Sequence, residues 1–265
     1  MKITLITGAS GGIGEAFARH LAKEGHHLLL IARSADKLRS LSEQLSQQYK
    51  ITAHYLAIDL AKQGSDEVIA REVRDKNLQV DWLINNAGIG SGGDLLEYTM
   101  DEYRNLMHLN MDAMVALTHQ FLPAMRTRRS GTIINVGSMA GFNGIPYMNV
   151  YAATKGFVMY FTAALWEENR LYNIHAMLLC PGATETGFFD AAKIGDRKSS
   201  FSTKKLETPE QVVASAMKGL KKKSMLTISG FQNKVMKALL RFIPVKAGMK
   251  MYGNMMRKNL NLDIK

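Results

Sequence analysis

The first twenty-two residues of the chain combine three features that few folds accommodate together. Residues 2–7 are mostly apolar and predict a short buried strand. A turn with glycine at positions 8, 11, 12 and 14 follows at once, and residues 15–22 favour a helix. Glycine lets the backbone approach a ligand closely, and the amino end of a helix offers free N–H groups to an anion. The sequence therefore predicts a strand, a phosphate-binding turn and a helix.

Strand and helix patterns alternate along most of the chain. Further apolar runs lie near residues 27–32, 51–57, 80–85, 131–137, 174–180 and 225–229, and helical stretches separate them. With residues 2–7 they make about seven strands, and the alternating order predicts a parallel sheet covered on both faces. A chain of 265 residues that is 46% hydrophobic can fill one such core. We therefore expect an α/β fold: a Rossmann-type, doubly wound, three-layer αβα domain over residues 1–230.

A phenol and an ammonium lie four residues apart at Tyr151 and Lys155. On a helix this spacing places both side chains on one face. The ammonium is expected to lower the pKa of the phenol from about 10 toward the range of a neutral-pH acid/base. Tyr147 has no such partner, because Tyr151 and not a cation follows it by four residues. A single pair of this kind is also typical of a solvated helix surface.

Ser138 supports the catalytic interpretation of that pair. Residues 132–137 form an apolar run that predicts a buried strand, and Ser138 would present its hydroxyl at the strand's carboxyl end. Open α/β sheets bind their ligands at this edge.

In order and spacing, these motifs resemble those of the classical short-chain dehydrogenase/reductase family. The resemblance covers nearly all of residues 1–230. The matching residues are the segment 7–14, Asp59, Leu60, Asn85, Asn86, Ala87, Gly88, Asn110, Ser138, Tyr151, Lys155, Pro181 and Gly182. The glycine spacing, Gly-x-x-x-Gly-x-Gly, differs from the Gly-x-Gly-x-x-Gly of other dinucleotide folds. The resemblance implies an oxidoreductase that transfers hydride reversibly between a nicotinamide and a carbonyl or secondary alcohol.

The resemblance also implies catalytic roles for Asn110, Ser138, Tyr151 and Lys155, with no metal. Tyr151 would donate the proton to the carbonyl oxygen, and Ser138 would hydrogen-bond that oxygen. Lys155 would lower the pKa of Tyr151 and hold the nicotinamide ribose. Asn110 would fix a water that relays protons to Lys155, although an asparagine at this place could instead bend or cap a helix.

The expected cofactor contacts follow the carboxyl ends of the predicted strands. They are Gly8, Ser10, Gly12, Ile13, Gly14, Arg33, Ser34, Asp59, Leu60, Asn86, Ala87, Gly88, Pro181, Gly182, Thr184 and Thr186, together with Tyr151 and Lys155. Asp59 has an alternative role as the cap of a following helix. Thr184 or Thr186 would bind the carboxamide or a phosphate.

Arg33 favours NADP(H) over NAD(H). It ends the second predicted strand, where an NAD-binding fold carries an Asp or Glu for the ribose 2′-hydroxyl. A guanidinium can bind a 2′-phosphate through two hydrogen bonds, and Ser34 would add a hydroxyl. The alternative is that Arg33 is a solvated loop residue and that another group, such as Asp36, sets the preference.

A substrate lid is expected at about residues 187–207, by analogy with the family. It contains Phe188, Phe189, Ile194 and Phe201, which suggest an apolar carbonyl substrate, although surface packing would explain these side chains as well. Lipid-like ketones, 3-oxoacyl thioesters, steroids and small carbonyls all remain open as substrates. Thr208 and Pro209 predict the start of the next helix, as cap and first residue.

All of the net charge lies at the end of the chain. Residues 218–265 contain twelve Lys or Arg and one acidic residue, Asp263, whereas the first 217 residues carry 22 basic and 22 acidic groups. On a helical projection, one half of residues 231–243 is apolar (Phe231, Val235, Met236, Leu239, Leu240, Phe242, Ile243), and Lys234, Lys237 and Arg241 lie opposite. Pro244 is expected to end this helix.

This basic amphipathic extension, residues 231–265, has several possible partners. Its apolar side would pack on the protein body or on a second subunit, or contact an anionic membrane surface. An acidic partner such as a coenzyme A thioester or a carrier protein would fit the charge. No nucleic-acid motif is present, so nucleic acid is not expected.

The remaining features predict a soluble cytoplasmic protein. Cys180 is the single cysteine, no Cys/His cluster has zinc spacing, and neither a leader nor an 18-residue apolar span is recognisable. By the resemblance, a homodimer or homotetramer is expected. The alternative to an enzyme is a non-catalytic NADPH-binding sensor or docking protein, although the complete set Asn110, Ser138, Tyr151 and Lys155 argues against it.

Overall fold

The computed structural model describes residues 1–188, 192, 206–240 and 242–259. Of the residues named above, Phe189, Ile194, Phe201, Arg241 and Asp263 lie outside this part, as does most of the expected lid.

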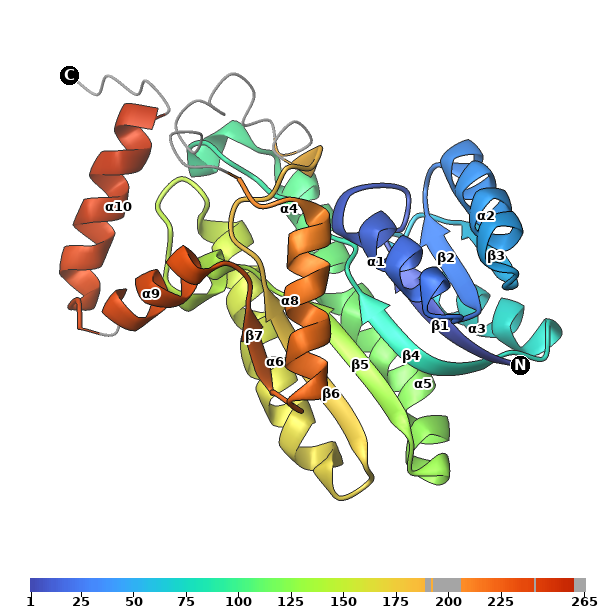
Figure 1. Ribbon diagram of the computed structural model, residues 1–265. Helices are drawn as coiled ribbons and strands as arrows, with labels where there is room; N and C mark the ends of the chain where they lie inside the picture. The colour runs from blue at the N-terminus through green and yellow to red at the C-terminus, as the bar shows by residue number, and fades with distance from the viewer. Residues whose placement is uncertain (189–191, 193–205, 241, 260–265) are drawn as a thin grey trace.

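Seven parallel strands form one sheet in the order β3-β2-β1-β4-β5-β6-β7 (Figure 1). The strands are β1 (Lys2–Thr7), β2 (Leu28–Ala32), β3 (Ala53–Ala57), β4 (Gln79–Asn85), β5 (Gly131–Val136), β6 (Ile174–Cys180) and β7 (Leu226–Ile228). Each overlaps one of the seven predicted runs. The prediction of a parallel sheet is confirmed.

The sheet is buried on both faces, which explains why its strands are continuous apolar runs. Within β2, Leu28, Leu30 and Ala32 belong to one core cluster. Leu29 and Ile31 alternate with them and belong to the other cluster. Because successive side chains of a strand point to opposite faces, one strand contributes to both cores.

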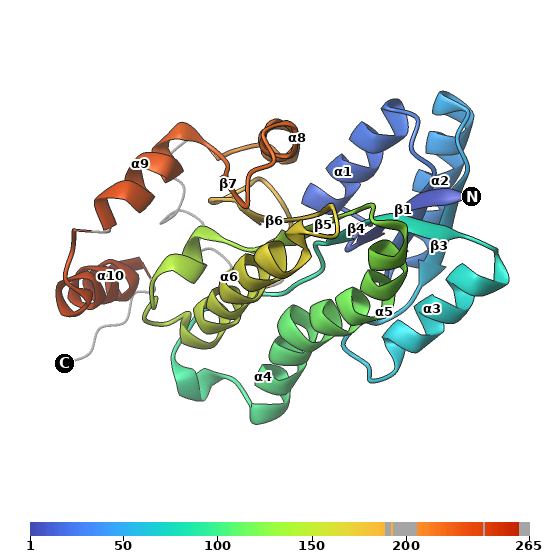
Figure 2. The same cartoon turned by 90° about the horizontal axis from the view of Figure 1, so that it is seen from below.

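Helices cover both faces and make three layers (Figure 2). One face carries α1 (Gly12–Lys23), α2 (Ala35–Tyr49) and α8 (Pro209–Lys221); the other carries α3 (Ser65–Asp75), α4 (Met100–Met107), α5 (Ala113–Arg128) and α6 (Asn149–Arg170). Short turns of other helix types are η1 (Leu95–Glu97), η2 (His108–Asp112) and η3 (Met139–Phe142). The Rossmann-type, three-layer α/β architecture is confirmed.

The strand order reverses between β1 and β4, which are neighbours in the sheet. Crossovers from these two strands leave in opposite directions, and folds of this kind bind their ligands in a crevice beyond the carboxyl ends at such a point. The loops that follow β1 and β4 meet there.

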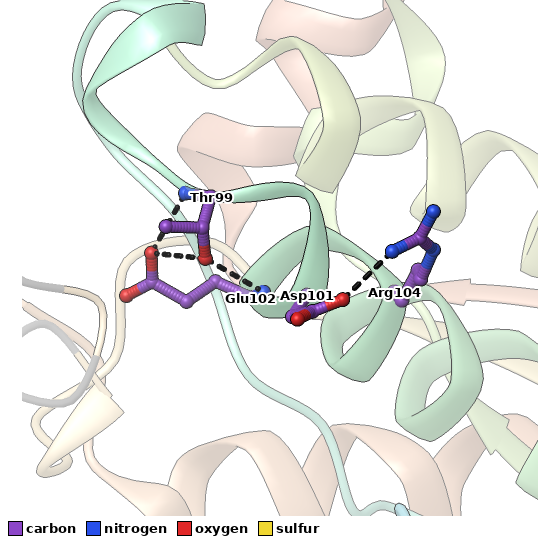
Figure 3. A network of polar contacts seen from close by, with 4 residues as sticks. All are labelled: Thr99, Asp101, Glu102 and Arg104. Atoms are coloured by element: carbon purple, nitrogen blue, oxygen red, sulfur yellow. Dashed lines mark hydrogen bonds and ion pairs between the residues drawn. The ribbon is translucent and has the colours of Figure 1, made fainter.

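Local capping signals set the helix starts. Thr99 caps α4: its hydroxyl accepts from the Glu102 backbone N–H (3.3 Å), and the Glu102 carboxylate accepts from the Thr99 backbone N–H (2.9 Å) (Figure 3). Asp101 pairs with Arg104 at 2.7 Å on the same turn. This reciprocal arrangement satisfies amide groups that the helix itself leaves unpaired. The predicted start of α8 is also confirmed, with Thr208 as cap and Pro209 as first residue.

The carboxyl-terminal segment forms two helices at the β7 edge of the sheet, α9 (Phe231–Leu240) and α10 (Val245–Asn259) (Figures 1 and 2). The expected single helix over 231–243 is wrong at its end, because Phe242 and Ile243 follow α9 in a turn. The second helix was not predicted. Pro244 precedes α10, in a position where its missing N–H costs no helical hydrogen bond.

Of the partners expected for the apolar side of this segment, the protein body does not cover most of its described residues. Phe231 is 79% exposed, Leu239 60% and Phe242 81%. None of the described residues of α9 is buried. Within the described ranges, no helix is both long and apolar enough to cross a membrane.

Candidate active site

The glycine turn between β1 and α1 is too tightly packed for other residues at two positions. Gly8 has φ +66°, in the left-handed region that glycine adopts most readily. A Cβ on Gly14 would lie 2.3 Å from the Gly8 carbonyl oxygen. Gly11 differs, because its φ of 173° suits any residue and a Cβ there would meet nothing within 4 Å. The turn is therefore closed on its inner side and open at Gly11.

The open side coincides with the amino end of α1. In the described part of the chain, no side chain caps this helix. The first amide groups of an uncapped helix, together with its dipole, favour an anion such as a pyrophosphate. The predicted residues Gly12, Ile13 and Gly14 form this first turn, and Ser10 lies half-buried just before it.

Thr7 and Asn86 hold the glycine turn against the loop after β4. The Thr7 hydroxyl accepts from the backbone N–H groups of Asn86 (2.9 Å) and Ala87 (3.0 Å). The Asn86 side chain donates to the carbonyl oxygens of Thr7 (2.9 Å) and Gly8 (3.4 Å). These bonds fix the floor of the crevice, so Asn86 has a structural task whether or not it touches a ligand.

The residues expected at the adenosine end lie around this crevice. Arg33 and Ser34 are exposed after β2, and no described group accepts from the Arg33 guanidinium. Ser34 precedes α2 without capping it through its side chain, so its hydroxyl is not used there. Asp59 accepts from the Ala61 backbone N–H (3.0 Å), while Leu60 is buried in the core. The alternative that Asp59 caps a helix is wrong, because it supports a turn and Gly64 is the cap of α3.

Asn110 joins three segments at the site. It lies in η2, a π-helical turn between α4 and α5, where such turns commonly mark functional positions. Its amide exchanges two hydrogen bonds of 2.9 Å with the backbone of Ile89, and its nitrogen also donates to the Thr154 hydroxyl at 3.1 Å. A Cβ on Gly88 would lie 3.0 Å from Asn110 Oδ1 and 3.5 Å from Lys155 Nζ. Asn110, Gly88 and Lys155 therefore adjoin one another.

Tyr151, Ser138 and Lys155 meet beyond the carboxyl ends of β5 and β6. Burial raises the pKa of Tyr151 to about 12, and a hydrogen bond with Ser138 acts in the opposite direction. Lys155 Nζ lies 5.9 Å from the centre of the Tyr151 ring and donates to the Val136 carbonyl oxygen at 2.9 Å. The predicted lowering of the Tyr151 pKa is not found in this arrangement, because burial disfavours the charged phenolate.

Burial also lowers the pKa of Lys155, to about 8. In the unfolded chain this side chain would titrate near 10.5. Between these values the unfolded chain binds more protons, so the free energy of unfolding should rise with pH. Below pH 8 the cost of burying the ammonium is fully present.

We therefore expect the stability of the wild type relative to Lys155→Met to rise by roughly 2 kcal/mol between about pH 7 and pH 10. Urea unfolding of both proteins without cofactor at the two pH values measures this difference. Lys258→Met, on the exposed side of α10, should show no such trend. A difference that stays constant with pH would contradict the assigned titration.

The loop after β6 lies against the glycine turn. Thr186 lies so near Gly12 that a Cβ there would be 2.9 Å from its methyl group. Thr184 is buried, with its hydroxyl donating to the Gly182 carbonyl oxygen (3.0 Å), and the Pro181 carbonyl oxygen accepts from Met139 N–H (3.0 Å). The predicted 181–186 segment thus reaches both the turn and the Ser138 loop.

Phe188 is the one expected lid aromatic whose position is described. Its ring centre lies 5.4 Å from that of Tyr151, with the planes tilted by 50°. It also contacts the loop after β4, because a Cβ on Gly90 would lie 2.5 Å from the Phe188 ring. An apolar wall therefore stands beside the candidate acid.

Two side chains of the carboxyl-terminal segment reach the site, which the sequence did not predict. Asn233 of α9 lies against Gly182 and donates to Glu207 (3.2 Å) and to the Ser229 carbonyl oxygen (2.8 Å). Met256 of α10 is fully buried in the cluster that contains Tyr151. The helical spacing of Met249, Gly253 and Met256, which places them on one face, is the sequence feature that could have indicated this contact.

The assembled site brings together a buried phenol, a buried amine and the uncapped amino end of α1 at the carboxyl edge of the sheet. This set suits proton donation beside a bound dinucleotide. No cluster of three or more potential metal ligands occurs among the described residues.

Comparison with known proteins agrees with this geometry. The model of a family described as short chain dehydrogenase matches residues 2–196. A ketoacyl reductase from Nostoc sp. is 29% identical over 243 residues, which are 91% of this chain and 83% of the relative. An NADP-dependent 3-hydroxy acid dehydrogenase from Schizosaccharomyces pombe is 30% identical over 233 residues, which are 86% of this chain and 90% of the relative. A very-long-chain 3-oxoacyl-CoA reductase from Bos taurus is 30% identical over 220 residues, which are 81% of this chain and 67% of the relative.

Solved structures show the same architecture. A short-chain dehydrogenase from Sphingobium yanoikuyae in complex with NADPH has a TM-score of 0.80 and 27% identity, covering 100% of this chain and 97% of that one. An alcohol dehydrogenase from Comamonas testosteroni, specific for bulky-bulky ketones, has a TM-score of 0.77 and 26% identity. The match covers 92% of this chain and 95% of that one. With the glycine turn, the crevice and the Tyr151 cluster in place, the family match over residues 2–196 shows that this chain belongs to the short chain dehydrogenase family of oxidoreductases.

Proposed function

We propose that the protein is an NADP(H)-dependent carbonyl reductase and alcohol dehydrogenase. It transfers hydride reversibly between the nicotinamide and a carbonyl or secondary alcohol carbon, with Tyr151 as acid and base. The observation that carries this proposal is the convergence of Tyr151, Ser138, Lys155 and Asn110 beside an open glycine turn. Named relatives reduce ketoacyl or 3-oxoacyl-CoA substrates or use NADP, which supports it.

Each of the four residues has a distinct role in this proposal. The Tyr151 phenol is protonated at neutral pH and donates its proton to the substrate oxygen during reduction. Ser138 hydrogen-bonds the substrate oxygen and stabilises its developing charge. Lys155 binds the nicotinamide ribose. Asn110 holds the Ile89 backbone and the Thr154 hydroxyl, and so positions a proton-relay water near Lys155.

The cofactor is held by the crevice residues. Gly8, Ser10, Gly12, Ile13 and Gly14 bind the pyrophosphate, with Gly11 leaving it room. Asp59, Leu60, Asn86, Ala87 and Gly88 line the adenosine side, and Pro181, Gly182, Thr184 and Thr186 border the nicotinamide. Bound NADPH supplies the hydride, and these residues orient it.

Arg33 and Ser34 set the preference for NADP(H) over NAD(H). The exposed Arg33 guanidinium, without a described acceptor, is available to a 2′-phosphate. Arg33→Glu should raise the KM for NADPH by roughly 10- to 100-fold, because charge-assisted hydrogen bonds are lost and a repulsive charge is gained. The KM for NADH should change little. Steady-state kinetics with both cofactors measure this switch.

A control and a contrary outcome define the Arg33 experiment. Arg170→Glu alters another exposed arginine, at the carboxyl end of α6, and should leave both KM values unchanged. If the ratio of the KM for NADPH to the KM for NADH is the same in Arg33→Glu as in the wild type, groups other than Arg33 set the cofactor preference.

The primary test of function is NADPH oxidation by the purified protein against short ketones, 3-oxoacyl thioesters and steroids. Turnover of at least one class, faster with NADPH than with NADH, is the expected result. Tight NADPH binding without turnover of any compound would instead support a sensor or docking protein on the same scaffold.

We further propose that α9 contacts an anionic membrane surface from the cytoplasm. Phe231, Leu239 and Phe242 are 60% exposed or more, and Lys234 and Lys237 lie nearby on α9. Apolar side chains flanked by cations suit the boundary between lipid headgroups and acyl chains. In this view residues 1–230 are the catalytic domain and residues 231–265 are an added docking segment.

Triple substitution Phe231→Ser, Leu239→Ser and Phe242→Ser should lower the affinity for phosphatidylglycerol vesicles by roughly tenfold or more, since each buried side chain contributes to binding. Vesicle sedimentation measures this effect, and higher salt should weaken binding further. Leu96→Ser, at an 89% exposed leucine in η1, is the matched control. Equal binding to neutral and anionic vesicles would contradict the proposal.

The oligomeric state is proposed to be a homodimer or homotetramer. The outer side of α6 exposes Tyr160 (74%) and Phe157 (40%), which suits contact with a second copy. Sedimentation equilibrium of the wild type and Tyr160→Glu tests this. If the α9 substitutions dissociate the oligomer instead, α9 is a subunit interface.

A further inference from the structure

A cavity beside the candidate active site has a cationic wall. It is open to the surface and has a volume of about 560 Å³ between α10 and the loops around residues 94–95 and 146–149. Lys246, Lys250 and Arg257 line it from α10, and Asp94 is the one acidic residue among its described lining residues. Asp94 is already engaged, because its carboxylate accepts from Leu96 N–H (3.0 Å) in the cap of η1. The cavity therefore has an excess of positive charge.

Among the described residues, these cations have no ion-pair partner. No ion pair among the described residues includes Lys246, Lys250 or Arg257. The Arg257 guanidinium donates to the neutral amide of Asn254 only among described hydrogen bonds. Unpaired cations gathered around a cavity favour a polyanion.

The spacing of the cations fits an elongated anion. Lys246 and Lys250 are four residues apart, and Arg257 follows seven residues later. At 1.5 Å per residue these steps are about 6 Å and about 10 Å along the helix. A single phosphate would engage only part of this row, whereas several phosphates on one molecule would engage all of it.

Methionines of α10 connect the cavity to the buried cluster that contains Tyr151, and Met249 also lines the cavity. Met249 approaches the backbone at Gly144, where a Cβ would lie 3.2 Å from its sulfur. Met256 is buried with Met148, Ala152 and Tyr151. The cavity and the candidate acid thus share one wall.

Tyr147 lies on that wall in an unusual backbone conformation. Its φ is +64°, in the left-handed region that bulky residues rarely adopt. Its carbonyl oxygen accepts from Gly93 N–H (2.8 Å), and its side chain both lines the cavity and packs in the cluster of Tyr151. Such strain commonly occurs at ligand sites.

We infer that this cavity binds the phosphate-bearing end of coenzyme A and that the substrate is a 3-oxoacyl-CoA thioester. This inference rests on the proposed function. The pantetheine arm would extend past Tyr147 and place the 3-oxo group beside Tyr151, with the acyl chain continuing along Phe188. NADPH would deliver hydride to C3 and Tyr151 a proton to its oxygen, giving the 3-hydroxyacyl-CoA and NADP⁺ with the thioester intact. Lys246, Lys250 and Arg257 would pair with the phosphates.

The test compares one 3-oxoacyl group on two carriers, coenzyme A and the uncharged N-acetylcysteamine. Lys246→Ala, Lys250→Ala and Arg257→Ala should each raise the KM for the coenzyme A ester by roughly 3- to 10-fold, and together by more. The kcat/KM for the coenzyme A ester, divided by the kcat/KM for the N-acetylcysteamine ester, should therefore fall. Lys258→Ala, a lysine of α10 outside the cavity lining, is the matched control.

The outcomes separate this inference from the proposed function. Equal KM values for both esters in the wild type, or equal effects of the substitutions on both, would overturn the coenzyme A site while the reductase stands. The same acyl group on an acyl carrier protein is measured as a third substrate, and substitutions that impair its reduction alone would assign the cations to that partner instead. If no ketone is reduced, calorimetric binding of coenzyme A to wild type and triple variant still tests the cavity. Unchanged NADPH affinity in the variants shows that they are folded.

Discussion

Tyr151→Phe is expected to lower kcat for ketone reduction by roughly 10²- to 10⁴-fold, the usual contribution of a positioned general acid. The substitution removes one oxygen and keeps the ring that packs 5.4 Å from Phe188. The fold and the affinity for NADPH should therefore persist. Stopped-flow or steady-state measurement of NADPH oxidation, with fluorescence titration of NADPH binding, separates the chemical effect from binding.

Tyr160→Phe provides the matched control, because Tyr160 is a 74% exposed tyrosine of the same helix. It should leave kcat unchanged. If Tyr151→Phe retained more than about a tenth of wild-type turnover, Tyr151 would not be the acid, since that loss is far below the range for general acid catalysis.

Gly14→Ala should lower the stability of the protein, whereas Gly11→Ala should leave its stability nearly unchanged. A methyl group at Gly14 would lie 2.3 Å from the Gly8 carbonyl oxygen, so the backbone must shift. We expect a loss of about 1–3 kcal/mol in the free energy of unfolding, or failure to fold. At Gly11 the methyl group meets no protein atom within 4 Å, so stability should change little.

Gly11→Ala should nevertheless weaken NADPH binding by roughly tenfold or more, if the pyrophosphate lies over the open side of the turn. Thermal unfolding and NADPH titration of both variants test this contrast. A Gly11→Ala protein that binds NADPH as the wild type does would place the phosphates elsewhere. A stable Gly14→Ala protein would show that the inner side of the turn can relax.

The parts of the fold that depend on local pattern could be predicted from the sequence. Each strand is an apolar run that ends at a turn signal, so β1 and β6 have the predicted bounds and β7 was recognised from only a few residues. The capping chemistry of Thr208 and Pro209 likewise depends on neighbouring residues alone. Burial of both sheet faces follows from the runs themselves, because buried parallel strands are continuously apolar.

Electrostatics at Tyr151 could not be predicted in the same way. Helical spacing correctly placed Tyr151 and Lys155 on one helix, but the pKa of a phenol depends on how deeply it is buried. That burial comes in part from Ala140, Phe188 and Met256, which belong to three other segments. A spacing rule carries no information about such contacts.

The carboxyl-terminal segment shows the same division. Its charge and amphipathic pattern are visible in the sequence, but α9 ends at Leu240, before Phe242 and Ile243, and a second helix, α10, follows Pro244. The approach of Asn233 to Gly182 and of Met256 to Tyr151 depends on where these helices return to the body. Positions far apart along the chain become neighbours only after folding.

The sequence by itself therefore determined the order of strands and helices, the glycine turn, and the residue types at the site, because these follow from local periodicity and chemistry. The tertiary structure alone decided which of these residues meet, the shifted pKa values of Tyr151 and Lys155, and the cationic cavity against α10. The physical reason is that burial and cavity shape arise from packing between distant segments, which no local pattern encodes.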